Sequence, residues 1–250
     1  MPSAVRIALP IVLTTLPLTA ASCTKDAPSP QVTARTFASS AGVPQKGFPN
    51  WTEQALYALT NRARNDPAAE LAATCTSCSG QTYPVARPLA YSVKGSRAAR
   101  FHATTLLKAG SGLMHDSVCK IVSNIDALYP DQCDGAPSCA CEGGAVNCRC
   151  QGTKPYCSCA SGACTSTWGR IGLFGYSAQG ENAAAAKSDP KATIKQWINS
   201  SGHRNNMLKT SHRSLGVGYY GGSGGCWGHF NVQVFGGGTL TTKLPGGVHY

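Results

Sequence analysis

Long apolar runs are scarce in this chain. After residue 18, no stretch approaches the eighteen or so apolar residues that a membrane helix needs. Acidic residues are also few, with 11 Asp and Glu against 22 Lys and Arg, which gives a net charge of +11 at pH 7. That charge permits weak binding to acidic polymers or membrane surfaces. The basic residues stand singly, without basic runs or interleaved aromatic residues, so no nucleic-acid partner is indicated.

The first 22 residues have the layout of a secretory signal peptide. Arg6 supplies a positive charge, and the uncharged apolar run from Ile7 to Leu18 is followed by three small residues beginning at Ala20. We expect cleavage after Ala20 or directly before Cys23, and the second would allow a lipid on Cys23. The sequence therefore predicts a secreted, extracytoplasmic protein, soluble or anchored to a membrane only through such a lipid.

The rest of the chain is expected to form one globular domain between residues 49 and 242. Before it, residues 23–48 are rich in Pro, Ser, Ala and Gln without apolar periodicity, which is typical of a flexible linker. The domain contains a cysteine-rich insert at about 119–164, and residues 243–250 form a C-terminal tail. We expect a monomer.

Thirteen cysteines in an exported chain predict disulfides, because compartments outside the cytoplasm are oxidising. Without Cys23, which leaves with the signal or carries the lipid, twelve remain, and we expect six bridges. Cys75 and Cys78 form a C-x-x-C motif in a loop rich in Ser, Thr and Gly, with no strand before it. That setting favours a structural pair over a redox site.

Eight of the cysteines lie between residues 133 and 164, where three C-x-C pairs recur every nine residues. The pairs are Cys139/Cys141, Cys148/Cys150 and Cys157/Cys159. Gly, Ser, Pro and Ala fill the intervals, so crosslinks must order this stretch. A thiolate zinc cluster is the alternative. We interpret the stretch as a disulfide-stapled insertion that offers a recognition surface.

Two helices are indicated by their ends. Asn50 and Glu53 have the spacing of a capping box, and Pro67 predicts a break in the helix that they begin. A second helix is predicted from Ser92 to Lys108, with Gly110 ending it.

The C-terminal part predicts another helix and two strands. Ser188 or Asp189 can cap a helix that has Pro190 in its first turn. Residues 215–220 and 229–235 alternate apolar and other residues, as strands do. Helices outside, strands between them and long loops predict an α/β (α+β) fold, a three-layer α/β/α sandwich with a disulfide-rich insertion.

Three polar residues stand in segments that are otherwise small or apolar, namely His115, Glu181 and His203. Imidazole and carboxylate ligands suit zinc or a similar divalent ion, with positions left for water or substrate. The same groups can act as general acid and base. The alternative is that each of the three has a separate structural role, with its own hydrogen-bond partners at a helix end or in a loop.

Seven segments along the chain match one known pattern in order. They are "LTNRARND", "LAYSVKGSRAARFHA", "MHDS", "GYSAQGENAAA", "WINSSGHRNNML", "LGVGYY" and "HFNVQVFGG". With them the sequence resembles the CAP superfamily (cysteine-rich secretory protein, antigen 5 and pathogenesis-related domains), especially its bacterial branch. The resemblance covers residues 50–240 apart from the insert. It implies an α/β/α sandwich with a central cleft, where many members place two His and two Glu that can hold a divalent ion.

By position in these motifs, His115 matches the first histidine and Glu181 the GEN glutamate. Many members have a second glutamate in a W-x-x-E element, but this chain has Ser200 there, which cannot supply a carboxylate. The second histidine has two candidates. His203 matches the bacterial branch, and His229 matches other members with a one-residue offset, which on a strand reverses the side chain's face. We predict a weakly bound ion, zinc or magnesium, at His115, Glu181 and one of these two.

The resemblance implies an exported binding domain rather than an enzyme of known reaction. The cleft is expected to accept a small lipid or sterol-like ligand, a divalent metal ion, or both. One alternative is a metal-assisted hydrolase in which His115 and Glu181 activate a metal-bound water. Another is a scaffold whose cysteine-rich insert binds a protein.

Overall fold

The computed structural model describes residues 49–151, 154–159, 164–223 and 226–237. The predicted signal peptide, Cys23, the whole predicted linker and the predicted tail lie outside these ranges. Within them, every helix is too short or too polar to cross a membrane.

A four-stranded sheet forms the middle of the domain, with the strand order β1–β5–β6–β4. The strands are β1 (Ala90–Tyr91), β4 (Gly180–Ala185), β5 (Ser214–Gly221) and β6 (His229–Gly236). β6 is antiparallel to both β4 and β5, and β1 is parallel to β5. The two strands predicted near the C-terminus are therefore confirmed as the centre of the sheet.

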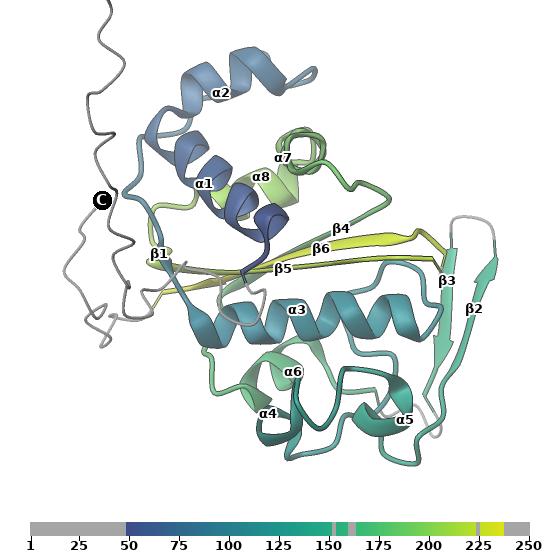
Figure 1. Ribbon diagram of the computed structural model, residues 1–250. Coiled ribbons are helices and arrows are strands. Elements are labelled where there is room, and N and C mark those ends of the chain that lie inside the picture. Colours follow the sequence, from purple (N-terminus) through teal and green to yellow (C-terminus); the bar gives the residue numbers. More distant parts are fainter. Residues whose placement is uncertain (1–48, 152–153, 160–163, 224–225, 238–250) are drawn as a thin grey trace, which may run out of the picture. The chain divides into compact units, whose positions relative to one another are not determined.

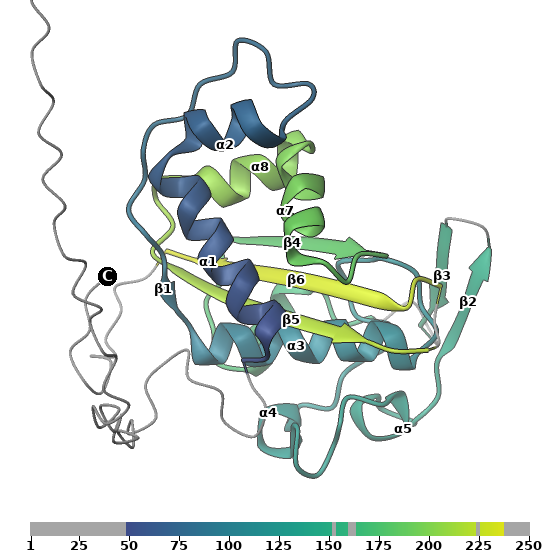
Figure 2. The ribbon, with the colours of Figure 1, turned by 45° about the horizontal axis from the view of Figure 1, so that its top comes forward.

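Helices cover both faces of this sheet and make three layers (Figures 1 and 2). One face carries α1 (Trp51–Asn65), α2 (Pro67–Thr74), α7 (Pro190–Ile198) and α8 (Ser201–Leu208). The other carries α3 (Val93–Lys108), α4 (Ile125–Leu128), α5 (Pro137–Ala140) and α6 (Thr167–Leu173). The predicted α/β/α sandwich is confirmed.

The helix ends follow the local sequence. Asn50 Oδ1 accepts the Glu53 N–H at 3.0 Å and Glu53 Oε2 accepts the Asn50 N–H at 2.9 Å, which completes the predicted capping box of α1. Asp66 caps α2, so a second helix, which was not predicted, follows the predicted break. Ser92, predicted as the first residue of a helix, is the N-cap of α3, and the predicted cap Asp189 begins α7.

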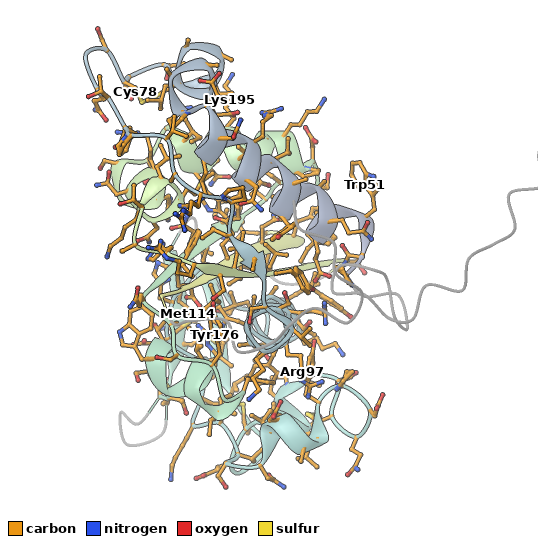
Figure 3. All side chains as sticks on the ribbon, turned by 90° about the vertical axis from the view of Figure 1, so that its left-hand side faces the viewer. Trp51, Cys78, Arg97, Met114, Tyr176 and Lys195 are labelled. Atoms are coloured by element: carbon orange, nitrogen blue, oxygen red, sulfur yellow. A yellow bond between two sulfur atoms is a disulfide. The ribbon has the colours of Figure 1, made fainter. Side chains whose placement is uncertain are left out.

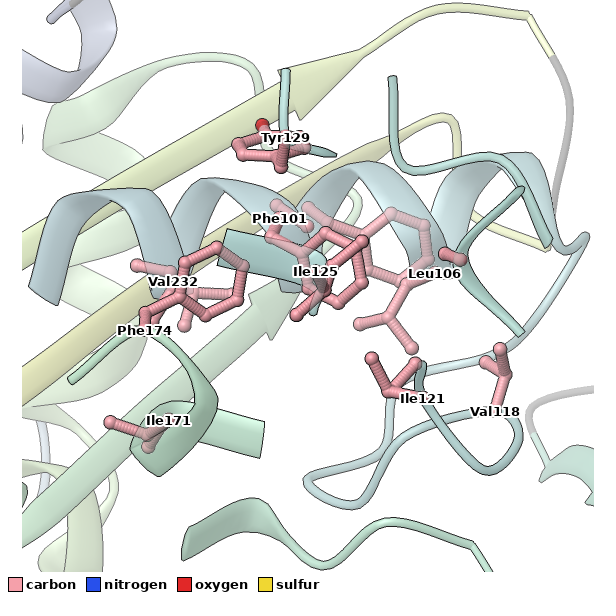
Figure 4. Close-up of a cluster of buried hydrophobic side chains, with 14 of the residues drawn as sticks. Phe101, Leu106, Val118, Ile121, Ile125, Tyr129, Ile171, Phe174 and Val232 are labelled. Atoms are coloured by element: carbon pink, nitrogen blue, oxygen red, sulfur yellow. The ribbon is translucent and has the colours of Figure 1, made fainter. Parts of the chain in front are cut away.

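β6 separates two apolar cores. Phe230, Val232 and Val234 belong to the core on the α3 side, and Phe235 belongs to the core under α1 and α7. On the α3 side, Phe101 packs edge-on against Tyr129, with ring centroids 5.4 Å apart (Figure 4).

Two glycines in β5 let α3 lie directly on the sheet. A Cβ at Gly218 would be 2.1 Å from the Arg100 nitrogen, and one at Gly216 would be 2.0 Å from the Gly95 carbonyl carbon. Real Cβ atoms are not found so close to backbone. Any side chain at either position would therefore push α3 away from β5.

β1 pairs only with Ser214 and Leu215 at the start of β5. Farther along this edge of β5, side chains from α3 and α1 accept hydrogen bonds from the backbone N–H groups. Ser96 Oγ accepts the Val217 N–H at 3.0 Å, and Glu53 Oε1 accepts the Tyr219 N–H at 3.1 Å. Arg100, on α3, pairs with the same Glu53 carboxylate.

The first half of the predicted insert is part of the core. Ile121 and Ile125 are buried against α3, together with Tyr129 (Figure 4). The two ends of the insert meet, because Thr165 donates its N–H to the Cys119 carbonyl oxygen at 3.2 Å. The chain therefore enters and leaves the insert at neighbouring points, between α3 and α6.

The second half holds a hairpin, β2 (Asn147–Gln151) and β3 (Lys154–Ser158). Disulfides join Cys75–Cys78, Cys119–Cys141, Cys133–Cys139, Cys148–Cys157 and Cys159–Cys164. Cys226 is also disulfide-bonded, so all eleven cysteine side chains that the structure describes are paired. For these eleven, disulfides are confirmed and a thiolate zinc cluster is ruled out. Cys23 and the Cys150 side chain lie outside the description.

Candidate functional site

The structure brings His115 and Glu181 together. His115 lies in the loop after α3, and Glu181 is the second residue of β4. The His115 Nδ1 is 2.9 Å from Glu181 Oε1. The two residues are 66 positions apart in the sequence, and the whole cysteine-rich insert lies between them.

Arg170 of α6 fixes both partners. Its Nη2 donates to Glu181 Oε2 at 2.7 Å and to the His115 carbonyl oxygen at 3.0 Å. Arg170 and Glu181 are almost fully buried. Burial alone would raise the pKa of Glu181, but Arg170, His115 and His102 together outweigh it and lower that pKa to about 2. Glu181 is therefore an ionised carboxylate at neutral pH.

An ionised carboxylate only accepts hydrogen bonds, so the His115 Nδ1 must carry the hydrogen of this contact. The hydrogen bond to Glu181 raises the pKa of His115, and partial burial opposes it. The His115 side chain remains 53% exposed. Its Nε2, the nitrogen left to accept a proton or bind a ligand, forms no hydrogen bond within the described residues.

His203, on α8, lies close enough to His115 for their charges to interact. Burial lowers the pKa of His203, and repulsion from His115 lowers it further. Its Nδ1 is buried and has no hydrogen-bond partner among the described residues. Asn182, next to Glu181, donates to the His203 carbonyl oxygen at 3.0 Å, which ties α8 to β4.

His229 does not lie with the other three. Glu181 is paired across the sheet with Val234, five residues from His229 along β6. At about 3.4 Å per residue this separation is roughly 17 Å. The ring of His229 stacks on Tyr219 instead, and its Nδ1 is 3.0 Å from the tyrosine oxygen. Of the two candidates, His203 is therefore the one that lies near His115 and Glu181.

Two residues beside the site were not predicted. Arg170 stands in "TWGRIGLFG", where nothing distinguishes it from a surface arginine. His102 of α3 is buried, and its Nε2 is 2.8 Å from the Met114 carbonyl oxygen, directly before His115. Burial first, and then Arg170, lower the pKa of His102 to about 3, so it is neutral and supports the His115 loop.

A metal centre with Glu181 as a direct ligand does not fit this arrangement. Both oxygens of Glu181 are engaged, one by His115 and one by Arg170. No three His, Cys, Asp or Glu side chains of the described ranges are grouped so that they could hold an ion. The side-chain groups that remain as possible metal ligands are the His115 Nε2 and the His203 ring. Two ligands suit only a weak metal site with open coordination positions.

Known proteins resemble parts of this chain. The profile of the cysteine-rich secretory protein family, CAP, matches residues 141–235. The Bacillus subtilis (strain 168) protein named Uncharacterized protein YkwD is 42% identical over 52 residues, which is 21% of this chain and 20% of that protein.

Two crystal structures are also similar. An extracellular protein containing a SCP domain, from Bacillus anthracis str. Ames, has 22% identity and a TM-score of 0.38 over 74% of this chain and 39% of its own. A cysteine-rich secretory protein from Staphylococcus aureus subsp. aureus Mu50 has 12% identity and a TM-score of 0.34 over 74% of this chain and 38% of its own. The chain thus spans a fifth of the curated relative and under two fifths of these two proteins.

Proposed function

Because the chain belongs to the CAP family, in its bacterial form, we propose that it works outside the cytoplasm as a binding domain whose ligand is held at His115 and His203. The disulfides support an oxidising location, since eleven described cysteines are paired. Mass spectrometry of the secreted protein tests it. An N-terminus between residues 21 and 23 is expected, and an intact Met1 would contradict export.

The ligand we propose for the pair is a divalent metal ion such as zinc, bound weakly and reversibly. The observation that carries this proposal is the His115–Glu181 contact, because it protonates Nδ1 and leaves Nε2 as a donor for a metal. Glu181 then acts from the outer sphere, where a carboxylate orients the ring and raises its basicity. The buried, unpartnered Nδ1 of His203 supports a second contact. Such an ion would act as a Lewis acid toward a bound oxygen ligand.

Isothermal titration calorimetry with zinc chloride tests the proposal on the oxidised protein. His115→Ala should abolish binding, and Glu181→Gln should weaken it about 10- to 100-fold. His203→Ala should also weaken it, whereas the matched control His229→Ala should bind zinc as the native protein does. If the native protein took up no zinc, or if His115→Ala bound it unchanged, the proposal would fail. The lipid or sterol-like ligand, the hydrolase and the protein-binding insert stay predictions from the sequence.

A further inference from the structure

Internal partners occupy many of the acidic side chains in the described ranges. Six carboxylates form ion pairs, namely Glu53–Arg100, Glu70–Arg62, Asp126–Arg97, Asp134–Lys108, Glu142–Lys120 and Glu181–Arg170. Asp66 and Asp189 cap helices. The excess positive charge of the protein is therefore located where basic residues have no acidic partner.

Residues 187–213 carry six basic side chains and only one acidic side chain. None of the six forms an ion pair with any residue in the described part of the chain. The acid is Asp189, whose two oxygens accept the N–H groups of Lys191 and Ala192. Arg204 is buried and bonded to Gln81. The excess charge of this segment thus lies on its exposed lysines and on Arg213.

Three of these lysines form what we call the lysine row: Lys187, Lys191 and Lys195. All three are exposed and follow one another at intervals of four residues. The last two are on α7, where four residues span about 6 Å along one face. The opposite face of α7 is buried through Ile194 and Trp197.

Lys191 and Lys195 of the lysine row lie on α7, which covers the face of the sheet opposite α3 (Figure 1). Figure 3 labels Lys195 on the α1 side, while Arg97 and Tyr176 lie across the sheet. The exposed large apolar side chains of the described chain are Trp51, Val85, Val93 and Trp168. None falls within residues 187–213, so this segment itself offers no exposed large apolar side chain to insert into a lipid surface, although Trp51 of α1 lies on the same face of the sheet.

We propose that the lysine row binds a linear polyanion that carries repeated phosphate groups. Lysine ammonium groups meet phosphate as mobile point charges, so a row of them suits a flexible chain better than a ligand of fixed shape. Counterion release then supplies affinity without a pocket. None of the three lysines is a member of the His115 site.

Long-chain inorganic polyphosphate is the probe, titrated into the full oxidised protein over a series of salt concentrations. Lys187→Gln/Lys191→Gln/Lys195→Gln should lower the affinity at least tenfold at about 50 mM salt. It should also reduce the slope of log affinity against log salt by about 2–3, since each lost contact removes just under one. The matched control, Lys94→Gln/Lys108→Gln/Lys120→Gln, removes the same charge from α3 and the insert and should change the affinity less than threefold.

Three readouts would overturn the proposal. Equal losses in both triple variants would show that net charge alone binds the probe. Stronger binding to phosphatidylglycerol vesicles than to polyphosphate, abolished by the lysine-row variant, would assign the surface to a membrane. A native protein that ignores polyphosphate at low salt would also refute it. Thermal unfolding of each variant confirms that these exposed substitutions leave the fold intact.

Discussion

Glu53 and Arg100 form a two-point ion pair that joins α1 to α3 around the side of β5. Arg100 Nε is 2.8 Å from Glu53 Oε1, and its Nη2 is 3.0 Å from Oε2. Both side chains are buried. The two helices lie on opposite faces of the sheet, so this pair links layers that the sheet otherwise separates.

Arg100→Met should lower the free energy of unfolding by about 3–5 kcal/mol, because it leaves the Glu53 carboxylate buried without its partner. Urea denaturation of the oxidised protein measures the loss. Lys120→Met is the control, since its pair with Glu142 is largely exposed and should contribute less than about 1 kcal/mol. A loss for Arg100→Met as small as the control's would contradict the reasoning.

Glu181→Gln should lower the pKa of His115. The native carboxylate raises that pKa, chiefly by its hydrogen bond to Nδ1, and an amide holds an imidazolium less well. The chemical shifts of the His115 ring protons, followed against pH by NMR, give the value. Glu70→Gln removes another buried carboxylate, one paired with Arg62, and should leave the His115 titration unchanged. An unchanged His115 pKa in Glu181→Gln would show that the contact does not persist in solution.

Acid should destabilise the native protein partly through Glu181. Its folded-state pKa of about 2 lies below the usual 4.5, so its stabilisation is complete above pH 4.5 and is lost as the pH falls toward 2. The free energy of unfolding, measured from pH 7 to pH 2.5, should fall less steeply in Glu181→Gln. His115 has the opposite sign, because its raised pKa stabilises the fold at low pH and that contribution fades as the pH rises above 6.5. Parallel curves for the native and variant proteins would reject this account.

Gly218→Ala should destabilise the fold by about 1–3 kcal/mol or more, because its Cβ would meet the backbone of α3. Gly172→Ala is the matched substitution on α6, where no atom lies within 4 Å of the new Cβ. It should raise stability by about 0.5–1 kcal/mol through helix propensity. Thermal unfolding compares the two, and equal effects would contradict the close approach of α3 to β5.

Removing the Cys119–Cys141 bridge should cost more stability than removing Cys75–Cys78. The two bridges close separations of 22 and 3 residues, for which loop-closure entropy gives about 3 and about 1.5 kcal/mol. Double alanine variants measured by urea denaturation provide the comparison. The opposite order would show that strain or unfolded-state structure decides the effect.

The helix ends were readable from the sequence because their signals are local. Asn50, Glu53, Ser92 and Asp189 bind backbone atoms within three residues of themselves. β4 was not predicted as a strand, because its "GENAAA" lacks β-branched residues and owes its extended form to the pairing with β6.

The candidate site was only partly predictable. The motifs that held His115, Glu181 and His203 were present in the sequence, so these residues could be proposed together. Arg170 could not be found in this way, because its role depends on a contact across the fold between α6 and β4. His229 stood in a motif of the right kind, but its distance along β6 became clear only from the strand register.

Ser96 and Glu53 accept hydrogen bonds from two backbone N–H groups at the edge of β5. These bonds affect how two copies of this protein can associate. A strand from a second molecule needs free donors to extend a sheet, and at Val217 and Tyr219 those donors are already bound. The central sheet is therefore protected against growth from this side into fibres.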